Sequence, residues 1–305
     1  MKAIERGTVV VLTYNRRARL LQTLRALQKL PERWPVIVVD NGSSDGTAEA
    51  VSQEFPSVML IRSRRNIGAA ARNIAVAYAH TPYIAFCDDD TRWQPGALQR
   101  AARILDEDPR VGVLSGCVVE DESGRIDPAC VQMARSPLDR ENLPGPQILG
   151  FRTEASVIRT RAFYEAGGFW PPLFIGGEET LLALDMADRG WRMVYIDDVV
   201  TMRAPSCPRN AAARLRCEIR NAIWVAWMRL PVKMAWQTTF EQLHRAAGVQ
   251  QLQPVLVSAT AGMARVLQRR HVITPRVAAM WASLYQQAVS AADEQPAQAS
   301  RRSMV

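Results

Sequence analysis

Several features that would identify a class of protein are scarce or missing in this sequence. The five cysteines are odd in number and form no CxxC pair, and no apolar leader with a cleavage site follows Met1. We therefore expect a reduced, cytoplasmic setting and no disulfide framework. No apolar run reaches the roughly 18 residues that a membrane-spanning helix needs, so we expect no segment that crosses a membrane. Peripheral attachment at the inner face of a membrane stays open.

Other absences narrow the chemistry. No GxGxxG follows the first apolar strand, which argues against a dinucleotide-dependent dehydrogenase. The glycine-rich N-terminal loop with Arg and Lys that a nucleotidyltransferase uses is also missing. A net charge of +8 favours anionic ligands such as nucleotide diphosphates, nucleic acid or acidic lipid head groups. Acidic residues at the strand ends argue against recognition of a phosphate backbone there, so we expect no nucleic acid among the partners.

What the sequence does contain is an alternation of apolar strands and amphipathic helices. Residues 8–16, "TVVVLTYNR", form a nearly continuous apolar run, and a helical stripe of Leu20, Leu21, Leu24 and Leu27 follows. The alternation continues to about residue 202 and predicts an α/β fold with a mostly parallel, Rossmann-like sheet and flanking helices. Ligands of such sheets bind at the carboxyl ends of the strands. Residues 121–149, rich in Pro, Gly and charge, are expected to form a long functional loop.

The composition changes after Pro205, where strand patterns stop. We predict a first domain over residues 1–205, a helical region over 206–290 and a tail without fixed structure over 291–305. Residues 214–237 mix basic side chains with tryptophans and are typical of a surface that lies on anionic lipid. The alternative, which we favour, is a helical cap whose Trp and Leu side chains pack onto the core.

The residues that indicate chemistry are acidic. Asp88, Asp89 and Asp90 directly follow an apolar strand, where carboxylates repel one another unless a cation is present. Mg²⁺ and Mn²⁺ prefer carboxylate and phosphate oxygens, so the triplet suits a metal that bridges the protein to a diphosphate. A solvated acidic turn would be the better interpretation of the triplet alone. Asp40, at the end of a second strand beside the tight turn "NGSSDGT", favours a ligand site instead.

Four segments in order complete this pattern: "VVVLTYNR", "VIVVDNGSSDGT", "RRNIGAAARNIA" and "YIAFCDDDTRWQPGAL". Together they resemble the motifs of family 2 glycosyltransferases with the GT-A fold. The resemblance covers about the first 100 residues and resumes over 167–198. It implies a Rossmann-like GT-A domain that moves a sugar from a nucleoside diphosphate sugar to an acceptor hydroxyl. The implied reaction inverts the anomeric centre and uses a divalent metal, Mn²⁺ or Mg²⁺.

The resemblance also implies roles for individual residues. The first-strand loop borders the nucleotide base, Asp40 hydrogen-bonds the base or ribose, and the turn after it flanks them. Asp88 lies near the ribose, Asp90 ligates the metal with Asp88 as a second ligand, and Asp89 shares either task. The donor-binding set implied in this way is Thr13, Tyr14, Asn15, Arg16, Asp40, Asn41, Gly42, Asn66, Gly68, Arg72, Asp88 and Asp89.

Two positions depart from the family pattern. Gly177, Glu178 and Glu179 stand where the family has Gly-Glu-Asp, so Glu179 takes the position of the general base and Glu178 competes with it. Both acids could instead favour only the positive end of a helix dipole. Trp170 and Gly177 are expected to line the acceptor or sugar pocket.

The second departure lies at "TMRAPS", where many relatives place a histidine. Arg203 and Ala204 occupy this stretch, and Arg203 could offset phosphate charge directly. The donor's base and sugar stay open, and the acceptor could be an envelope polysaccharide, a lipid carrier or a small specialised metabolite. Two alternatives to a glycosyltransferase remain open: a sugar-nucleotide-binding protein without transfer activity, and a nucleotidyltransferase.

Overall fold

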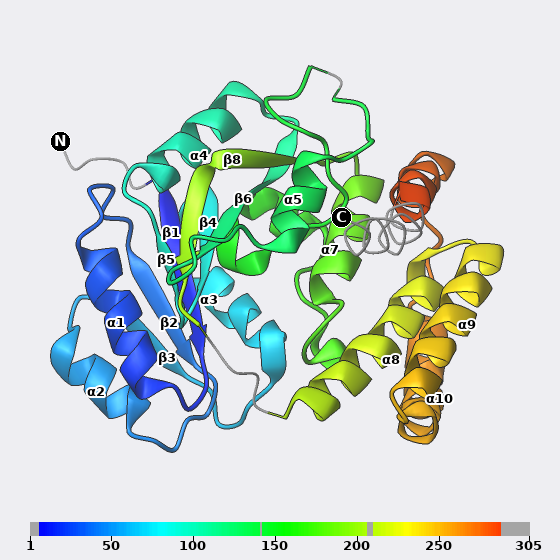
Figure 1. Ribbon diagram of the computed structural model, residues 1–305. Helices are drawn as coiled ribbons and strands as arrows, with labels where there is room; N and C mark the ends of the chain where they lie inside the picture. The colour runs from blue at the N-terminus through cyan, green and yellow to red at the C-terminus, as the bar shows by residue number, and fades with distance from the viewer. Residues whose placement is uncertain (1–5, 141, 206–209, 288–305) are drawn as a thin grey trace, which may run out of the picture.

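The computed structural model describes residues 6–140, 142–205 and 210–287, and within them a single eight-stranded sheet forms the centre of the molecule (Figure 1). The strand order is β3-β2-β1-β4-β7-β6-β8-β5. The strands are β1 (Gly7–Thr13), β2 (Val36–Asp40), β3 (Met59–Arg62), β4 (Tyr83–Asp88), β5 (Thr91–Trp93), β6 (Val111–Glu120), β7 (Ser156–Arg159) and β8 (Arg192–Arg203).

The N-terminal half of the sheet is parallel, as the sequence predicted. β1 lies between β2 and β4, with Thr13 opposite Asp40 and Leu12 opposite Asp88. The carboxyl ends of these three strands therefore meet at one edge of the sheet. The acidic residues that follow β2 and β4 are brought together by this register alone.

Helices cover both faces of the sheet, which explains why its central strands β1 and β4 are buried and largely apolar. α1 (Arg17–Gln28), α2 (Thr47–Glu54) and α4 (Ala97–Glu107) pack on one face, while α3 (Arg72–Tyr78), α6 (Thr160–Glu165) and α7 (Glu178–Asp188) pack on the other (Figure 1). Successive strand residues point to opposite faces, so Val10 belongs to one apolar cluster and Val9 and Val11 to the other.

The C-terminal half of the sheet is mixed, while four of the seven strand pairings in the described sheet are parallel, as expected of a mostly parallel sheet. β7 runs antiparallel to both β4 and β6, and the short strand β5 runs antiparallel to β8. Among the described residues of this half, β6 and β8 are the only strands that pair in parallel. An apolar run that is covered on both faces has the same pattern in either direction, so strand direction could not be read from the sequence.

The segment expected as a long loop, residues 121–149, contains a helix. α5 (Pro128–Ala134) begins after Asp127, whose carboxylate accepts a hydrogen bond from the backbone N–H of Ala129 at 2.9 Å. Three single 3₁₀ turns also shape this face of the molecule: η1 (Gly68–Ala71), η2 (Thr153–Ala155) and η3 (Pro171–Leu173). η2 packs against β4 and β6, and η3 packs against η1.

Several helices follow Pro205, as the composition predicted. They are α8 (Ala211–Arg229), α9 (Val232–Gly248), α10 (Leu252–Gln268) and a further helix over residues 275–287. α9 and α10 pack against α8 at the edge of the molecule (Figure 1). The domain boundary at residue 205 stays a prediction, and the expected tail at 291–305 lies outside the described residues. Among the described residues, no helix is long and apolar enough to cross a bilayer.

The tryptophans of α8 point into the protein. Trp224 is 6% exposed, and its indole N–H donates to the carbonyl of Ala259 at 2.9 Å. The indole N–H of Trp227 donates to Thr239 at 3.0 Å. α8 therefore packs as a helical cap, the alternative that the sequence favoured, whereas Trp236 on α9 is 48% exposed.

Candidate active site

A cavity of about 900 Å³ opens where the carboxyl ends of β1, β2 and β4 face the start of α7. It gathers most of the residues that the sequence marked for function, from both halves of the chain. Those that line it are Thr13, Tyr14, Arg16, Asn41, Asn66, Gly68, Arg72, Asp88, Asp89, Asp90, Glu178 and Glu179.

The three aspartates of the triplet are held by two arginines. Arg72 reaches Asp88 at 2.5 Å, and one guanidinium nitrogen of Arg16 reaches Asp90 at 2.8 Å and Asp89 at 3.2 Å. Burial raises the pKa of Asp89 to about 7, although Arg16 and the hydroxyl of Thr13 oppose that shift. In this arrangement arginine side chains offset the repulsion among the carboxylates.

The donor atoms of the triplet fit a divalent metal that shares its coordination with a substrate. Within the described residues, no group of three or more His, Cys, Asp or Glu could enclose a metal ion. Mg²⁺ and similar ions are commonly bound by one or two carboxylates together with phosphate oxygens, rather than by a cage of protein ligands alone. Asp88 and Asp90, which face the cavity, offer that smaller set of oxygens.

Three residues expected at the donor site do not line the cavity. Asp40 is fully buried, where one carboxylate oxygen accepts from the backbone N–H of Ser43 at 2.9 Å and the other has no hydrogen-bond partner. Asn15 instead ties the β1 loop to the turn, accepting from the N–H of Ser44 at 2.8 Å. Gly42, with φ of +85°, shapes that same turn. The structure thus gives these residues a turn-forming role in place of the expected cavity contact.

Asn41, Asn66 and Gly68 form a tight connection in the cavity wall. The Asn41 amide donates to the side-chain oxygen of Asn66 at 2.9 Å and to the carbonyl of Gly68 at 3.1 Å. Gly68 has φ of +68°, and a Cβ there would lie 2.0 Å from the carbonyl oxygen of Phe174. Only glycine lets the segment after η3 approach this closely.

The two glutamates at the start of α7 have different environments. Glu179 is anchored, because one of its oxygens accepts from both the backbone N–H and the hydroxyl of Thr153, at 2.7 and 2.5 Å. Glu178 is half-buried, and one of its oxygens is enclosed without a hydrogen-bond partner. Burial, followed by the charge of Glu179, raises the pKa of Glu178 to about 7, while Arg72 opposes the shift.

Trp170 and Gly177 do not line the cavity, which corrects their expected place in an acceptor or sugar pocket. Trp170 is 9% exposed and makes an edge contact with Trp224 of α8, with ring centroids 6.2 Å apart. Gly177 precedes α7 with φ of +84° and packs against Asn221. Both residues join the sheet domain to α8, and their neighbours Gly176 and Glu178 reach the cavity instead.

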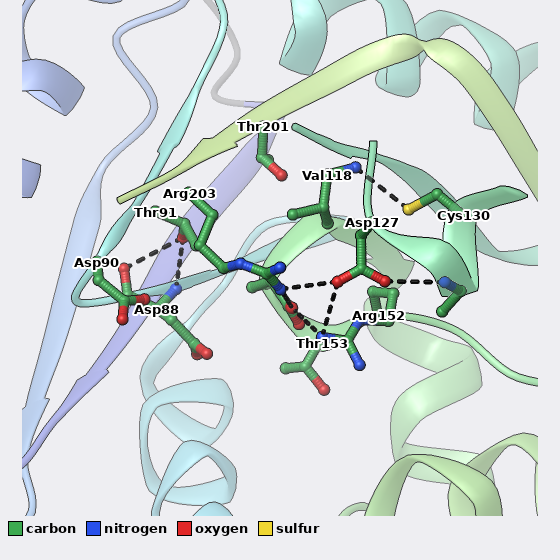
Figure 2. A network of polar contacts seen from close by, with 12 residues as sticks. Asp88, Asp90, Thr91, Val118, Asp127, Cys130, Arg152, Thr153, Thr201 and Arg203 are labelled. Carbon is green, nitrogen blue, oxygen red and sulfur yellow. Dashed lines mark hydrogen bonds and ion pairs between the residues drawn. The ribbon is translucent and has the colours of Figure 1, made fainter. Parts of the chain in front are cut away.

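Arg203 lines the cavity but forms its ion pairs away from the triplet, and its expected role of offsetting phosphate charge stays a prediction. Figure 2 shows its side chain directed toward Asp127 and away from Asp88 and Asp90. Its guanidinium lies 2.9 Å from Asp127 and 3.5 Å from Glu154. Acidic residues from α5 and η2 therefore hold it.

The same network supports the anchored glutamate. Arg152 contacts Glu154 at 2.6 Å and Asp127 at 3.8 Å (Figure 2). Thr153, which binds Glu179, stands between Arg152 and Glu154 in the chain. Sequence reasoning missed this segment because its side chains meet α7 and β8 only in the folded chain. The segment's only signal was two charges, Arg152 and Glu154, inside an otherwise apolar stretch.

The first turn of α8 also reaches the cavity, which the sequence did not reveal. Asn210 caps this helix by accepting from the N–H of Ala213 at 3.2 Å. The cavity wall at this end includes Asn210, Ala213, Arg214 and Cys217. The helical region thus supplies part of the site.

The structure has a mixed sheet flanked by helices, an acidic triplet at the strand ends and a glutamate pair across one cavity. Together these features define a GT-A-type transferase fold. A mannosyltransferase from Pyrobaculum calidifontis, solved with GDP-Man and Mn²⁺, shares this fold with a TM-score of 0.57 at 21% identity, over 94% of this chain and 87% of that one. TarS of S. aureus, residues 1–349 with UDP-GlcNAc, gives a TM-score of 0.60 at 18% identity, over 90% and 83% of the two chains.

Sequence comparison identifies the family. The model of glycosyl transferase family 2 matches residues 8–169, and the chain belongs to this family. An N-acetylglucosaminyl-diphospho-decaprenol L-rhamnosyltransferase of Mycobacterium tuberculosis is 28% identical over 268 residues, which cover 74% of this chain and 87% of the relative. The chain is therefore a family 2 glycosyltransferase, which decides against the nucleotidyltransferase alternative.

Proposed function

We propose that the protein transfers a sugar from a nucleoside diphosphate sugar to an acceptor hydroxyl, with inversion and with help from Mg²⁺ or Mn²⁺. One observation carries the proposal: a single cavity joins the wall of Asp88, Asp90 and Arg72 to the anchored carboxylate of Glu179. A donor diphosphate and an acceptor hydroxyl could then meet within one enclosed space.

The triplet side of the cavity is suited to the donor. Arg72 and Arg16 supply guanidinium groups for a diphosphate, and Tyr14, 42% exposed, offers a ring face to a base. A divalent metal held by Asp90 and Asp88 would neutralise the charge on the departing nucleoside diphosphate. Binding of such a donor requires Arg16 and Arg72 to exchange their carboxylate contacts for phosphate contacts.

The α7 side is suited to activating the acceptor. We assign Glu179 as the general base, because Thr153 fixes one of its oxygens and leaves the other for the acceptor hydroxyl. Direct attack by that hydroxyl, with the nucleoside diphosphate leaving from the opposite face, inverts the anomeric carbon. Glu178, whose pKa lies at about 7, is the alternative base.

The proposed acceptor is a sugar on a polyprenyl diphosphate, used for an envelope polysaccharide at the inner face of a membrane. Support comes from the M. tuberculosis relative, whose name specifies a diphospho-decaprenol-linked acceptor and an L-rhamnosyl group. Arg214 adds a cation to the part of the cavity wall that α8 forms. A donor carrying L-rhamnose is therefore the first to test, and contact with the membrane through the C-terminal helices is part of this proposal.

The test measures release of nucleoside diphosphate from a panel of nucleotide sugars, with and without Mn²⁺ and with a polyprenyl-diphosphate N-acetylglucosamine acceptor. Glu179→Gln should lower kcat by about 100-fold or more, and Asp90→Asn should remove the stimulation by Mn²⁺. Glu107→Gln, at an exposed position on α4, serves as the matched control and should be unaffected. Donor binding without release for any acceptor would contradict the proposal and indicate a sugar-nucleotide-binding protein.

A further inference from the structure

The helical hairpin of α9 and α10 carries apolar side chains that face solvent. They lie on both helices and are Trp236, Phe240, Leu252, Leu256, Val257 and Leu267, a set that we name the hairpin face. Phe240 and Val257 are the most open, at 65% and 64% exposed. Trp236 and Phe240 stack on each other with centroids 5.7 Å apart, so this part of the hairpin face is a continuous aromatic surface.

α10 is the more unusual of the two helices. Residues 252–264 contain no charged side chain, although the helix lies at the edge of the molecule (Figure 1). Leu256, Val257 and Leu267 fall on one side of the helix at 100° per residue, while Val255 and Val266 face inward and are fully buried. A surface helix normally presents charged side chains to water, so an uncharged outer side indicates a further contact.

The charge of the chain is concentrated in the same region. Residues 211–287 contain ten Arg and Lys but only two Glu, which accounts for the whole net charge of +8. Lys233, Arg245 and Arg265 are exposed on the hairpin and, within the part of the chain that the structure describes, form no ion pair. Apolar and cationic side chains thus occur together on α9 and α10.

We propose that the hairpin face lies flat on an anionic lipid bilayer, with its apolar side chains at the level of the head groups and acyl chains. The surrounding cations would attract acidic head groups, since the charge of the hairpin and that of the lipid are opposite. A second copy of the chain would instead bring the same positive charge against this face, which disfavours self-association.

This inference rests on the proposed function in one respect, the delivery of the acceptor. α8 packs against both helices of the hairpin, and its first two turns line the cavity through Ala213, Arg214 and Cys217. A lipid-linked acceptor held at the bilayer would therefore approach the cavity from the side of α8. Of the region that the sequence marked for lipid contact, 214–237, this assignment keeps Trp236 on α9 and adds exposed apolar residues further along α9 and on α10.

The experiment mixes the full chain with sedimentable vesicles of phosphatidylglycerol or of phosphatidylcholine and measures the bound fraction. Binding should favour phosphatidylglycerol. It should weaken as the salt concentration rises from about 0.1 to about 0.5 M, because salt in this range screens the attraction between surface charges. The variant Val257→Glu/Leu267→Glu should lower the partition coefficient at least about tenfold, because it puts two anions into the contact. Tyr78→Glu on α3, 54% exposed, is the matched control and should bind like the wild type.

Two results would overturn the inference: no sedimentation with phosphatidylglycerol vesicles, or a loss of binding that is the same for Tyr78→Glu. A concentration-dependent dimer in light scattering that Val257→Glu/Leu267→Glu abolishes would assign the hairpin face to a second copy instead. Nucleoside diphosphate release with a water-soluble acceptor separates this inference from the proposed function. The Val257→Glu/Leu267→Glu variant should retain that release, whereas Glu179→Gln should lose it and still bind vesicles.

Discussion

At the scale of single residues, the site separates two neighbouring glutamates by their surroundings. Thr153 anchors Glu179 with two hydrogen bonds, whereas burial keeps Glu178 protonated up to a pH of about 7. Pairs of acids in different environments commonly take different roles in catalysis. The sequence identified both residues but could not rank them, because the anchor comes from a segment 26 positions away.

The raised pKa of Glu178 predicts a pH-dependent stability. The folded chain holds this proton up to a pH of about 7, whereas the unfolded chain releases it near the ordinary glutamate pKa of 4.5. The associated stability is therefore complete below pH 4.5 and is lost as the pH rises through 7. Glu178→Gln, which imitates the protonated form, should be more stable than the wild type at pH 8 by at most about 3 kcal/mol.

Urea unfolding at pH 5 and pH 8 measures this difference. At pH 5 the two proteins should have similar free energies of unfolding, and at pH 8 the variant should be the more stable. Glu107→Gln, exposed on α4, controls for a general change in charge. A variant that is less stable than the wild type at pH 8 would show that ionised Glu178 is stabilised by Arg72 more than burial disfavours it.

Thr153 provides a second prediction at this scale. Thr153→Val keeps the shape of the side chain but removes the hydroxyl that donates to Glu179. The base then loses part of its alignment, so kcat should fall by about tenfold, while the KM for the donor should change little because Thr153 lies on the acceptor side. Thr153→Ser should restore kcat. An equal rise of the donor KM would point to a general disturbance of the cavity.

At the scale of elements, the sequence predicted the helices and the longer strands well where their apolar pattern is strong. It missed β5, which is three residues long, and α5, which lies between charged and Pro-rich stretches. It also could not give the direction of β7, since direction depends on which strands lie beside it in the folded sheet. The same holds for the site. Its residues at the strand ends can be predicted from the sequence, but the residues that η2 and α8 bring to it cannot.

The contact between η1 and the segment after η3 gives a prediction for an element. Gly68→Ala places a methyl group against the carbonyl of Phe174 in a backbone conformation that alanine adopts poorly. The contact should open, at a cost of about 1–3 kcal/mol in the free energy of unfolding. Because Gly68 and Phe174 both line the cavity, the KM for the donor should rise as well. Gly124→Ala, also at positive φ but with open space around it, separates backbone strain from the clash.

At the scale of the whole molecule, the apolar core extends from the sheet into the C-terminal helices. One cluster contains Phe86 and Leu182 from the sheet domain together with Val225 and Val266 from α8 and α10. A buried ion pair crosses the same junction, between Asp185 on α7 and Arg229 on α8. The sequence alone does not show this pairing, because the two residues lie 44 positions apart.

This junction predicts that sheet and helices unfold together and that the ion pair contributes to their coupling. Asp185 is 8% exposed and Arg229 6%, so Asp185→Ala leaves a buried guanidinium without its counter-ion and should cost about 3–5 kcal/mol. The double variant Asp185→Ala/Arg229→Met should cost less than the sum of the single variants, since removing the second charge also removes the penalty of burying it alone. Calorimetry should show one transition for the wild type and for the double variant. Two separate transitions in the wild type would mean that the helices fold independently, and the acceptor end of the cavity would then be built by a part of the molecule that can detach from the donor end.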